Sequence, residues 1–337
     1  MAIKYNPTDF MYSSARVRAL ENSIIGRDKT EHMLDSGSSS DIIAALGEYG
    51  FDIIRKSDTD GDILREETLL SVLEKAYDEI SKMPPDPSLT DFLRYQYDCN
   101  NIKAVIKCNS RGIDPHSMLF SLGTVPAKNV IEFIRDKKYS EFPPKMAEAL
   151  PLAIEAFATS ANPQQIDLIM DRACFLDMYN AAIATGEDYI VELVRTKIDL
   201  VNIITCIRIL GMKLYFAAEP FMREAFLEGG YLNLNFFISG LEFGIQKLFE
   251  ALEFTQYSLL SKEAGPTSPL YIVEKLADNI WLDFVKKAKY IPFGAPVLVG
   301  YLIALEYEVK NIRIILAGKD AGLPTDTIKE RLRASYV

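Results

Sequence analysis

The chain has 337 residues, of which 49% are hydrophobic and 25% are charged, and its formal net charge is −10 at pH 7. This negative charge argues against nucleic acid and anionic lipid headgroups as partners, because both are bound mainly through Lys and Arg. A chain of this length can bury roughly three quarters of its unfolded surface and can form two or three domains. Other proteins are therefore the first class of partner to consider.

Helical signals dominate the chain from its start. Residues 1–21 contain no apolar core of the kind that a signal peptide needs, and alternating runs typical of strands are missing further on. Gly37–Ser40 (GSSS) is typical of a helix N-cap, and Glu141–Met146 (EFPPKM) is typical of a turn. The proline-rich segments Met83–Ser88 and Glu263–Pro269 predict breaks, because proline does not continue a helix. The predicted fold class is all-α, with many short helices.

The longest near-apolar run is Ile291–Leu305 (IPFGAPVLVGYLIAL). A bilayer-spanning helix needs about 20 apolar residues, whereas this run is shorter and contains Pro292 and Pro296. The run predicts a buried core helix, and the sequence predicts no membrane-spanning segment.

The segment Lys56–Glu67 (KSDTDGDILREE) partly matches a calcium-binding loop. With Gly61 at the sixth loop position, three aspartates and Glu67 fall at the third, fifth, seventh and twelfth positions. Lys56 stands where the first ligand, normally Asp, should be, and it would point a cation at the ion. Calcium binding is the minor alternative, a solvated turn before a helix is the preferred interpretation, and no metal site is predicted.

Few residues of this chain are typical of catalysis. Glycine-rich phosphate-binding motifs and HExxH are absent, and His32 and His116 have no Asp or Cys partner suggested by spacing, so both are predicted to lie on the surface or at a helix cap. The cysteines lack CxxC spacing and lie in apolar helix-like runs, so they are predicted to be buried small hydrophobic residues in a reducing compartment: Cys99, Cys108, Cys174 and Cys206. No cofactor is predicted, although catalytic partners that meet only in the fold stay open.

One helical pattern occurs three times. An acid is followed three residues later by Asn-Ile and an aliphatic run, at Asp98, Asp199 and Glu308. Apolar residues in steps of 3, 4, 3 and 4 lie on one helix face; they are Phe92, Tyr95, Cys99, Ile102 and Ile106 in copy 1, Leu193, Thr196, Leu200, Ile203 and Ile207 in copy 2, and Leu302, Leu305, Val309, Ile312 and Leu316 in copy 3. The period of about 100 residues is longer than that of common solenoid repeats. It predicts three similar helical domains with pseudo-threefold symmetry, at residues 1–113, 114–215 and 216–337.

The similarity continues past the helix between copies 1 and 3. Gly112-Ile113 corresponds to Gly322-Leu323, which is typical of a helix stop. In copy 2, Leu214–Pro220 has the character of an insertion. The segment Ala15–Gly26 (ARVRALENSIIG) keeps the apolar spacing but lacks the acid and the asparagine. We expect it to be a partial copy that packs against the C-terminal helices.

The repeated polar residues need an explanation of their own. Asn costs roughly half a kcal/mol relative to Ala inside a helix, yet Asn101, Asn202 and Asn311 recur at one place. Arg94 and Arg195 lie four residues before the first two acids, and copy 3 has Ala304 there. The order Arg then Asp is the weaker orientation for an ion pair along a helix. The preferred interpretation is a half-buried network that fixes how the next helix docks, and direct partner contact is the alternative.

Three segments together suggest a family. Tyr12–Ile25 (YSSARVRALENSII), Lys197–Arg208 (KIDLVNIITCIR) and Glu308–Leu332 resemble the C subunit of archaeal and bacterial V/A-type ATPases, which is equivalent to the d subunit of the eukaryotic vacuolar proton pump. The resemblance implies an all-α funnel of three similar domains around a pseudo-threefold axis. It also implies a non-catalytic rotor component, peripheral on the cytoplasmic face of the membrane, that joins the central stalk to the proteolipid ring. The stalk partners implied are the D subunit, which is a coiled coil, and the F subunit.

By this resemblance, several positions match family signatures and are expected to have structural or interface roles. They are Arg16 and Arg18 in the first segment, Asn202 and Arg208 in the second, and Asn311 and Arg313 in the third. The implied activity is torque transmission for ATP-linked H⁺ or Na⁺ translocation. The ion, the direction of the reaction and the face that meets each partner stay open. An unrelated all-α scaffold and an all-α enzyme are the alternatives.

Overall fold

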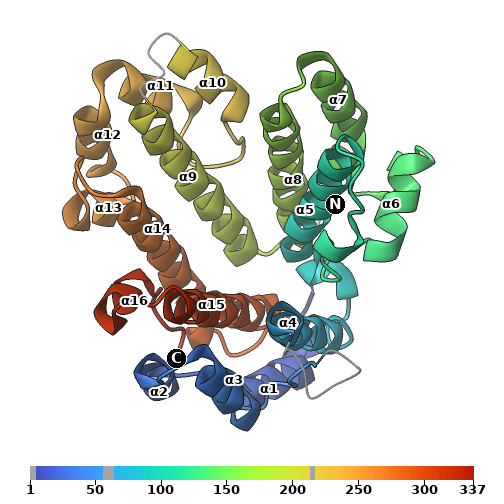
Figure 1. Ribbon diagram of the computed structural model, residues 1–337, viewed down its shortest axis with the longest axis vertical. Coiled ribbons are helices and arrows are strands. Elements are labelled where there is room, and N and C mark those ends of the chain that lie inside the picture. Colours follow the sequence, from blue (N-terminus) through green and yellow to red (C-terminus); the bar gives the residue numbers. More distant parts are fainter. Residues whose placement is uncertain (1–4, 56–63, 213–216) are drawn as a thin grey trace. The chain divides into compact units, whose positions relative to one another are not determined.

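The computed structural model describes residues 5–55, 64–212 and 217–337. Within them, all regular secondary structure is helical (Figure 1), which confirms the all-α prediction. The described chain forms two compact units, unit 1 from residues 88–270 and unit 2 from residues 5–87 and 271–337. The unit boundaries lie at or next to the two proline-rich segments predicted as breaks. The division into three domains stays a prediction.

Unit 1 is built around the long helices α5, α8 and α9. Helix α8 packs against α5, α7 and α9, and α9 packs against α10 and α11 (Figure 1). The helices are α5 (Asp91–Asn109), α6 (Ala127–Arg135), α7 (Pro144–Ser160), α8 (Pro163–Thr185), α9 (Asp188–Gly211), α10 (Ala218–Ala225), α11 (Leu234–Phe243), α12 (Ile245–Leu252) and α13 (Ser258–Glu263). Short 3₁₀ helices cover His116–Met118 and Tyr139–Glu141, and Pro87–Thr90 lies at the boundary.

Unit 2 is built around one long C-terminal helix, α15 (Ala295–Asp320), which packs against α1, α3, α4 and α16 (Figure 1). The N-terminal segment therefore packs against a C-terminal helix, as expected. The other helices are α1 (Met11–Leu20), α2 (Arg27–Asp35), α3 (Ser39–Glu48), α4 (Arg65–Ser81), α14 (Leu270–Val285) and α16 (Thr325–Arg331), with 3₁₀ helices at Pro7–Phe10, Glu21–Ser23 and Lys286–Tyr290.

Local sequence explains several helix ends. Ser38 caps α3 and forms a capping box with Asp41, in the segment predicted as an N-cap. Gly112 and Gly322 both have φ of 64°, and the N–H of the next residue donates five residues back, to Cys108 and Gly318. This Schellman geometry confirms that both glycines end a helix.

The predicted apolar faces are buried. Every residue from Ala295 to Leu305 is buried, so this part of the run Ile291–Leu305 forms the core helix that the sequence predicted, whereas Pro292 and Phe293 before it are exposed. All members of the three repeated stripes are buried except Tyr95, which is half-buried. In the part of the chain that the structure describes, no helix combines the length and the apolar character needed to cross a bilayer.

Candidate functional site

The repeated asparagines bind backbone in the same way three times. Asn101 Nδ2 donates to Phe120 O at 2.8 Å, and Phe120 N–H donates back to Asn101 Oδ1 at 2.8 Å. Asn202 makes the same pair of bonds with Leu227, at 2.8 and 2.9 Å. Asn311 makes them with Arg333, at 3.1 and 2.9 Å. Each asparagine thus completes both backbone groups of one loop residue, as a strand neighbour would do.

The repeated acids hold the end of the same loop. Asp98 accepts the N–H groups of Thr124 and Val125, both at 3.0 Å, and the hydroxyl of Thr124 at 2.6 Å. Asp199 accepts the N–H groups of Tyr231 and Leu232, at 2.9 and 3.1 Å. We call each acid–asparagine pair, with the backbone that it binds, a clamp: clamp 1 on α5, clamp 2 on α9 and clamp 3 on α15.

Clamp 3 is made from both ends of the described chain. Glu308 accepts the N–H of Ile25 at 3.0 Å, whereas Asn311 binds Arg333. In clamps 1 and 2, one continuous loop supplies both contacts. In clamp 3, the segment after α16 supplies the asparagine contact and the segment before α2 supplies the acid contact.

The clamps share their position relative to the helices. Each asparagine binds the second residue after a short helix, which ends at Met118, Ala225 or Arg331. Each acid binds the N–H two residues before the next helix, which starts at Ala127, Leu234 or Arg27. From asparagine to partner the chain runs 19 residues in clamp 1 and 25 in clamp 2, in line with the predicted insertion in copy 2.

Arginine and glycine complete clamps 1 and 2. Arg94 donates to Leu122 O at 3.0 Å and to Gly123 O at 2.6 Å, and Arg195 donates to Gly230 O at 3.2 Å. A Cβ added to either glycine would lie 2.2 or 2.0 Å from an oxygen of the clamp aspartate. Only glycine lets the loop backbone come this close to the carboxylate.

Burial sets the protonation of the clamp acids. It raises the pKa of Asp98 and of Asp199 above the ordinary value, while the bonds that they accept and the nearby arginine act against this rise. Burial raises the pKa of Glu308 to about 7, opposed by the bond from Ile25 and by the charge of Lys29. Glu308 accepts one hydrogen bond, whereas Asp98 and Asp199 each accept three, so fewer bonds oppose the effect of burial on the pKa of Glu308.

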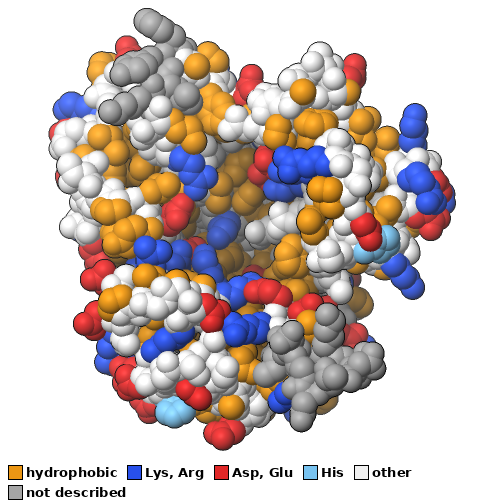
Figure 2. All heavy atoms as spheres, in the orientation of Figure 1, with side chains coloured by type: hydrophobic (Ala, Val, Ile, Leu, Met, Phe, Trp, Pro, Cys, Tyr) orange, Lys and Arg blue, Asp and Glu red, His pale blue; other side chains and the backbone are white. Residues whose placement is uncertain are grey.

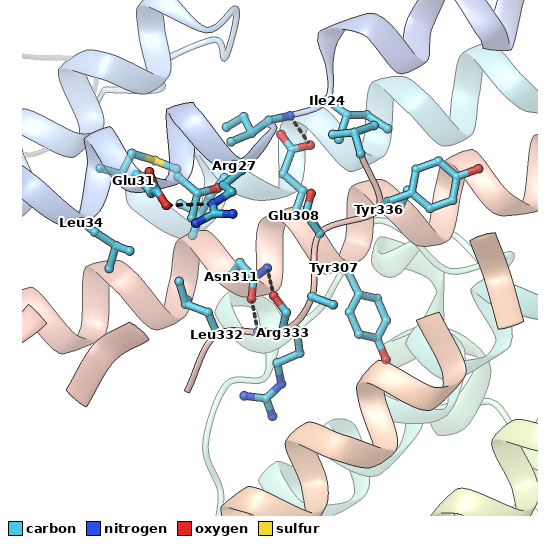
Figure 3. A pocket seen from close by; sticks show the side chains of 18 of the residues that line it. Ile24, Arg27, Glu31, Leu34, Tyr307, Glu308, Asn311, Leu332, Arg333 and Tyr336 are labelled. Atoms are coloured by element: carbon cyan, nitrogen blue, oxygen red, sulfur yellow. Dashed lines mark hydrogen bonds and ion pairs between the residues drawn. The ribbon is translucent and has the colours of Figure 1, made fainter. Parts of the chain in front are cut away.

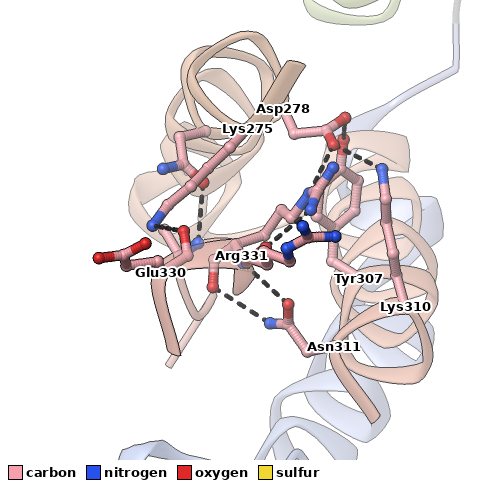
Figure 4. A network of polar contacts seen from close by, with 10 residues as sticks. Lys275, Asp278, Tyr307, Lys310, Asn311, Glu330 and Arg331 are labelled. Carbon is pink, nitrogen blue, oxygen red and sulfur yellow. Dashed lines mark hydrogen bonds and ion pairs between the residues drawn. The ribbon is translucent and has the colours of Figure 1, made fainter. Parts of the chain in front are cut away.

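Two further residues, Tyr257 and Asp278, bind residues of the clamps without any local signal for this in the sequence. The hydroxyl of Tyr257, from the segment before α13, donates to Asp199 at 2.7 Å. In unit 2, Asp278 accepts from Tyr307 at 2.8 Å, Lys310 at 2.5 Å and Arg333 at 2.8 Å (Figure 4). The Asp278 cluster therefore ties α14, α15 and the segment after α16 together beside clamp 3.

A cavity of about 460 Å³ lies over clamp 3. Its walls come from α2, α15 and the segment 332–337, with Arg27 and Glu31 on one side and Glu308 and Asn311 on another (Figure 3). Ala304 and apolar side chains such as Ile24 and Leu34 also line it. Its size falls within the usual range for small-molecule sites.

The remaining predicted positions lie apart from the clamp acids. Arg16 is exposed and forms an ion pair with Glu79 at 2.9 Å. Arg18 binds Glu21 at 2.8 Å and donates to the carbonyls of Ala288 and Ile291, so it joins α1 to the entry of α15. Arg313 pairs with Glu66 at 2.8 Å, and Arg208 is exposed near the end of α9. The structural or interface role of the predicted residues stays a prediction.

The residues considered for catalysis and metal binding were also located. All four cysteines are buried and free, and both histidines are exposed, as predicted. Among residues 5–55, 64–212 and 217–337, no three His, Cys, Asp or Glu side chains are grouped to hold a metal ion. Most of the calcium-like segment, residues 56–63, lies outside the described residues, so that alternative stays untested.

Large apolar side chains are exposed on both units. Phe254 is 91% exposed and Phe243 65% exposed in unit 1, and Tyr290 is 88% exposed in unit 2. Figure 2 shows hydrophobic side chains on the surface over α12 and α13, mixed with acidic and basic ones. Exposed aromatic residues among charges are common in surfaces that bind other proteins.

Comparison with known proteins decides the family. The ATP synthase (C/AC39) subunit family matches residues 13–331. The chain belongs to this family. The match spans all three clamp helices, so it confirms the resemblance seen in the sequence.

Relatives of the family match over nearly their full length. The C subunit of the A-type ATP synthase of Methanocaldococcus jannaschii is 24% identical over 96% of this chain and 86% of its own length. The C subunit of the V-type sodium ATPase of Enterococcus hirae is 24% identical, over 95% and 97%. The C subunit of the A-type ATP synthase of Thermococcus kodakarensis is 22% identical, over 97% and 90%.

Proposed function

We propose that this chain is a non-catalytic rotor component of a V/A-type ATPase. It joins the D and F subunits of the central stalk to the membrane proteolipid ring and transmits torque between them. The observation that carries the proposal is the family match over residues 13–331, which includes the main elements of both units. Because the relatives include components of an ATP synthase and of a sodium ATPase, the proposal covers H⁺ or Na⁺ translocation in either direction.

The clamps support a role that depends on a rigid fold rather than on a catalytic site. All six clamp side chains bind backbone of the same chain: they hold the loops that follow α5 and α9, and in clamp 3 the segments before α2 and after α16. Buried polar networks whose groups are satisfied make a fold rigid and unique. A protein that transmits torque needs such rigidity, and we include the three-domain pseudo-threefold funnel in the proposal for the same reason.

The proposed contacts with the stalk and the ring lie on the surface. Torque transfer needs many modest contacts over a broad interface, so no single side chain is expected to be indispensable. The exposed aromatic residues Phe254, Phe243 and Tyr290 are candidates for these contacts. The chain would then be peripheral on the cytoplasmic face, held there by protein contacts.

Co-purification tests the proposal. A tagged chain would be expressed in the source organism and recovered from membranes solubilised in mild detergent, with an untagged strain as the control. We expect the eluate to hydrolyse ATP and to contain the proteolipid and the D and F subunits, while the isolated chain hydrolyses nothing. Recovery with soluble partners only would overturn the proposal and favour the scaffold alternative.

A further inference from the structure

The cavity in unit 2 lies where clamp 3 departs from the other two. Ala304 occupies the position of Arg94 and Arg195, four residues before the clamp acid. In clamps 1 and 2 these arginines place a guanidinium near the aspartate, and their positive charge acts against the rise that burial gives to the pKa of the aspartate. In clamp 3 the short side chain of Ala304 lines the cavity instead.

Glu308 consequently has an unused carboxylate oxygen at this cavity. The side chain is only 8% exposed, and Ile25 N–H is the one hydrogen-bond donor that the described residues give it. Within the described chain, no cation lies within 4.0 Å of this carboxylate, although the charge of Lys29 acts on it from further away. A buried carboxylate without an ion pair is costly, so a cation that reaches it gains binding energy.

The other charged side chains at the cavity already interact with one another or with neighbouring carboxylates. Arg27 pairs with Glu31 at 2.9 Å, and the charge of Lys329 also acts on Glu31. Arg333 pairs with Asp278 at 2.8 Å, and Lys286 pairs with Asp283 at 3.0 Å. Among the described residues, Glu308 is therefore the carboxylate that a ligand in this cavity would meet without an ion pair.

We propose that this cavity binds a small organic cation, an alkylguanidinium or alkylammonium, with its N–H groups on Glu308 and its apolar stem over Ala304. The ligand places near Glu308 a positive charge of the kind that Arg94 and Arg195 place near Asp98 and Asp199. The apolar walls at Ile24 and Leu34 suit the stem. The same chemistry can come from a free amine or guanidine, or from a Lys or Arg side chain of a partner protein in the complex.

Calorimetric titration of the folded chain with butylguanidinium at pH 8 tests this site, with butylurea as the neutral probe of the same shape. We expect saturable binding of butylguanidinium at one site. Butylurea should bind at least about tenfold more weakly, because it lacks the charge that strengthens the hydrogen bond to Glu308. Glu308→Gln should weaken the binding of the cation at least about tenfold, because it removes the charge and keeps an acceptor for Ile25.

A second pair of variants keeps the test independent of Glu308. Ala304→Arg should abolish binding of butylguanidinium and raise the melting temperature at pH 8 above that of Ala304→Met, which has a similar length and no charge. The advantage of Arg over Met should disappear when Glu308→Gln is added, as a double-mutant cycle measures.

Four results would overturn the site. The first two are no saturable binding of butylguanidinium up to about 10 mM, where the binding free energy is very small, and equal binding of butylurea. The other two are unchanged binding by Glu308→Gln and unchanged binding by Ala304→Arg. The same titration on the purified complex identifies the source. If the complex still binds butylguanidinium, the natural ligand of the site is a free cation. If the isolated chain binds butylguanidinium and the complex does not, a Lys or Arg side chain of a partner protein occupies the site in the complex. Neither result depends on the proposed rotor role.

Discussion

Clamps 1 and 2 differ from clamp 3 in how the acid of the long helix binds backbone from another segment. In clamps 1 and 2, an aspartate accepts hydrogen bonds from one continuous loop. A glycine in this loop lets the backbone approach the carboxylate closely. In the third, a longer glutamate reaches across to the N–H of Ile25, which is 283 residues away in sequence. The comparison shows that the bond from the acid to the N–H two residues before a helix is kept, while the covalent connection to that helix is not.

The difference also changes the energetics. Asp98 and Asp199 each accept three hydrogen bonds, which offset much of the cost of burying a charge. Glu308 accepts one, and its pKa rises to about 7. Clamps 1 and 2 should therefore depend on loop shape, and clamp 3 on pH.

The largest loss of stability is expected from substitutions that block the close approach of the loop backbone to the aspartate in unit 1. In Gly123→Ala and Gly230→Ala, the new Cβ would lie 2.2 or 2.0 Å from the aspartate oxygen, so the loop must move and its bonds to the carboxylate break. We expect a loss of about 4 kcal/mol in the free energy of unfolding, from two charge-assisted bonds and local strain. Urea denaturation would measure it.

Gly265→Ala is the matched control for these two variants, because nothing lies within 4 Å of its added Cβ. It should change stability by less than about 0.5 kcal/mol. If Gly230→Ala is as mild as Gly265→Ala, the close approach of loop and carboxylate does not hold clamp 2 together.

The second effect concerns pH and clamp 3. The folded pKa of Glu308, about 7, lies above its ordinary value of 4.5, so the folded state holds this proton more tightly than the unfolded state. Its contribution to stability is complete below pH 4.5 and declines as pH rises to about 7, by about 3 kcal/mol. Glu308→Gln cannot ionise, so it should be more stable than the wild type at pH 8 by up to this amount.

Denaturation of both proteins between pH 5 and pH 8 checks this prediction, and the difference between them isolates Glu308 from other groups. The advantage of Glu308→Gln should grow with pH and level off above pH 7. A difference that stays constant over this range would mean that Glu308 is ionised throughout. Asp98→Asn is a useful contrast, because it disturbs three accepted bonds and should destabilise the protein at every pH.

The asparagines allow a smaller and more direct comparison. Asn101→Ala and Asn202→Ala should each cost about 2 kcal/mol, because two bonds to a buried loop residue are lost. Asn311→Ala should cost about 1 kcal/mol, since Asn311 is half-buried and Arg333 keeps its ion pair with Asp278. Equal costs at the three sites, measured by denaturation, would show that the third clamp is not reinforced from Asp278.

The smallest effect is expected at Arg16. Its ion pair with Glu79 joins two side chains that are 47% and 38% exposed, so water and salt screen it. A double-mutant cycle with Arg16→Ala and Glu79→Ala should give a coupling of about 0.5 kcal/mol or less, falling with salt. A coupling above about 1 kcal/mol would mean that this signature residue stabilises unit 2 more than its exposure suggests.

Local features of the fold were predictable because they depend on neighbouring residues. Stripe spacing predicted the buried faces of α5, α9 and α15, and the N-cap segment Gly37–Ser40 predicted the start of α3, where Ser38 is the cap. The glycines at 112 and 322 predicted helix ends, because the left-handed backbone there favours glycine. The repeated acid and asparagine also marked the residues of the clamps, though not what they bind.

The partners of the clamps could not be predicted, because buried carboxylates accept any N–H that the fold brings within reach. Nothing in the sequence near Tyr257 or Asp278 indicates a bond to Asp199 or to Arg333. The change from Arg to Ala304 was visible in the repeat, but the cavity that accompanies it depends on the path of the segment 332–337. Such contacts follow from tertiary structure rather than from periodicity.

Cross-linking within the assembled complex tests the proposed rotor role most directly. Because the native cysteines are buried, Phe254→Cys or Tyr290→Cys offers one exposed thiol for a photoreactive linker. A covalent link from this chain to the proteolipid ring or to the coiled coil of the central stalk should leave ATP-driven ion transport intact, because linked rotor parts turn together. Transport that stops on linking to the ring, while ATP hydrolysis also stops, would contradict the account, since the chain would then belong to the stationary part.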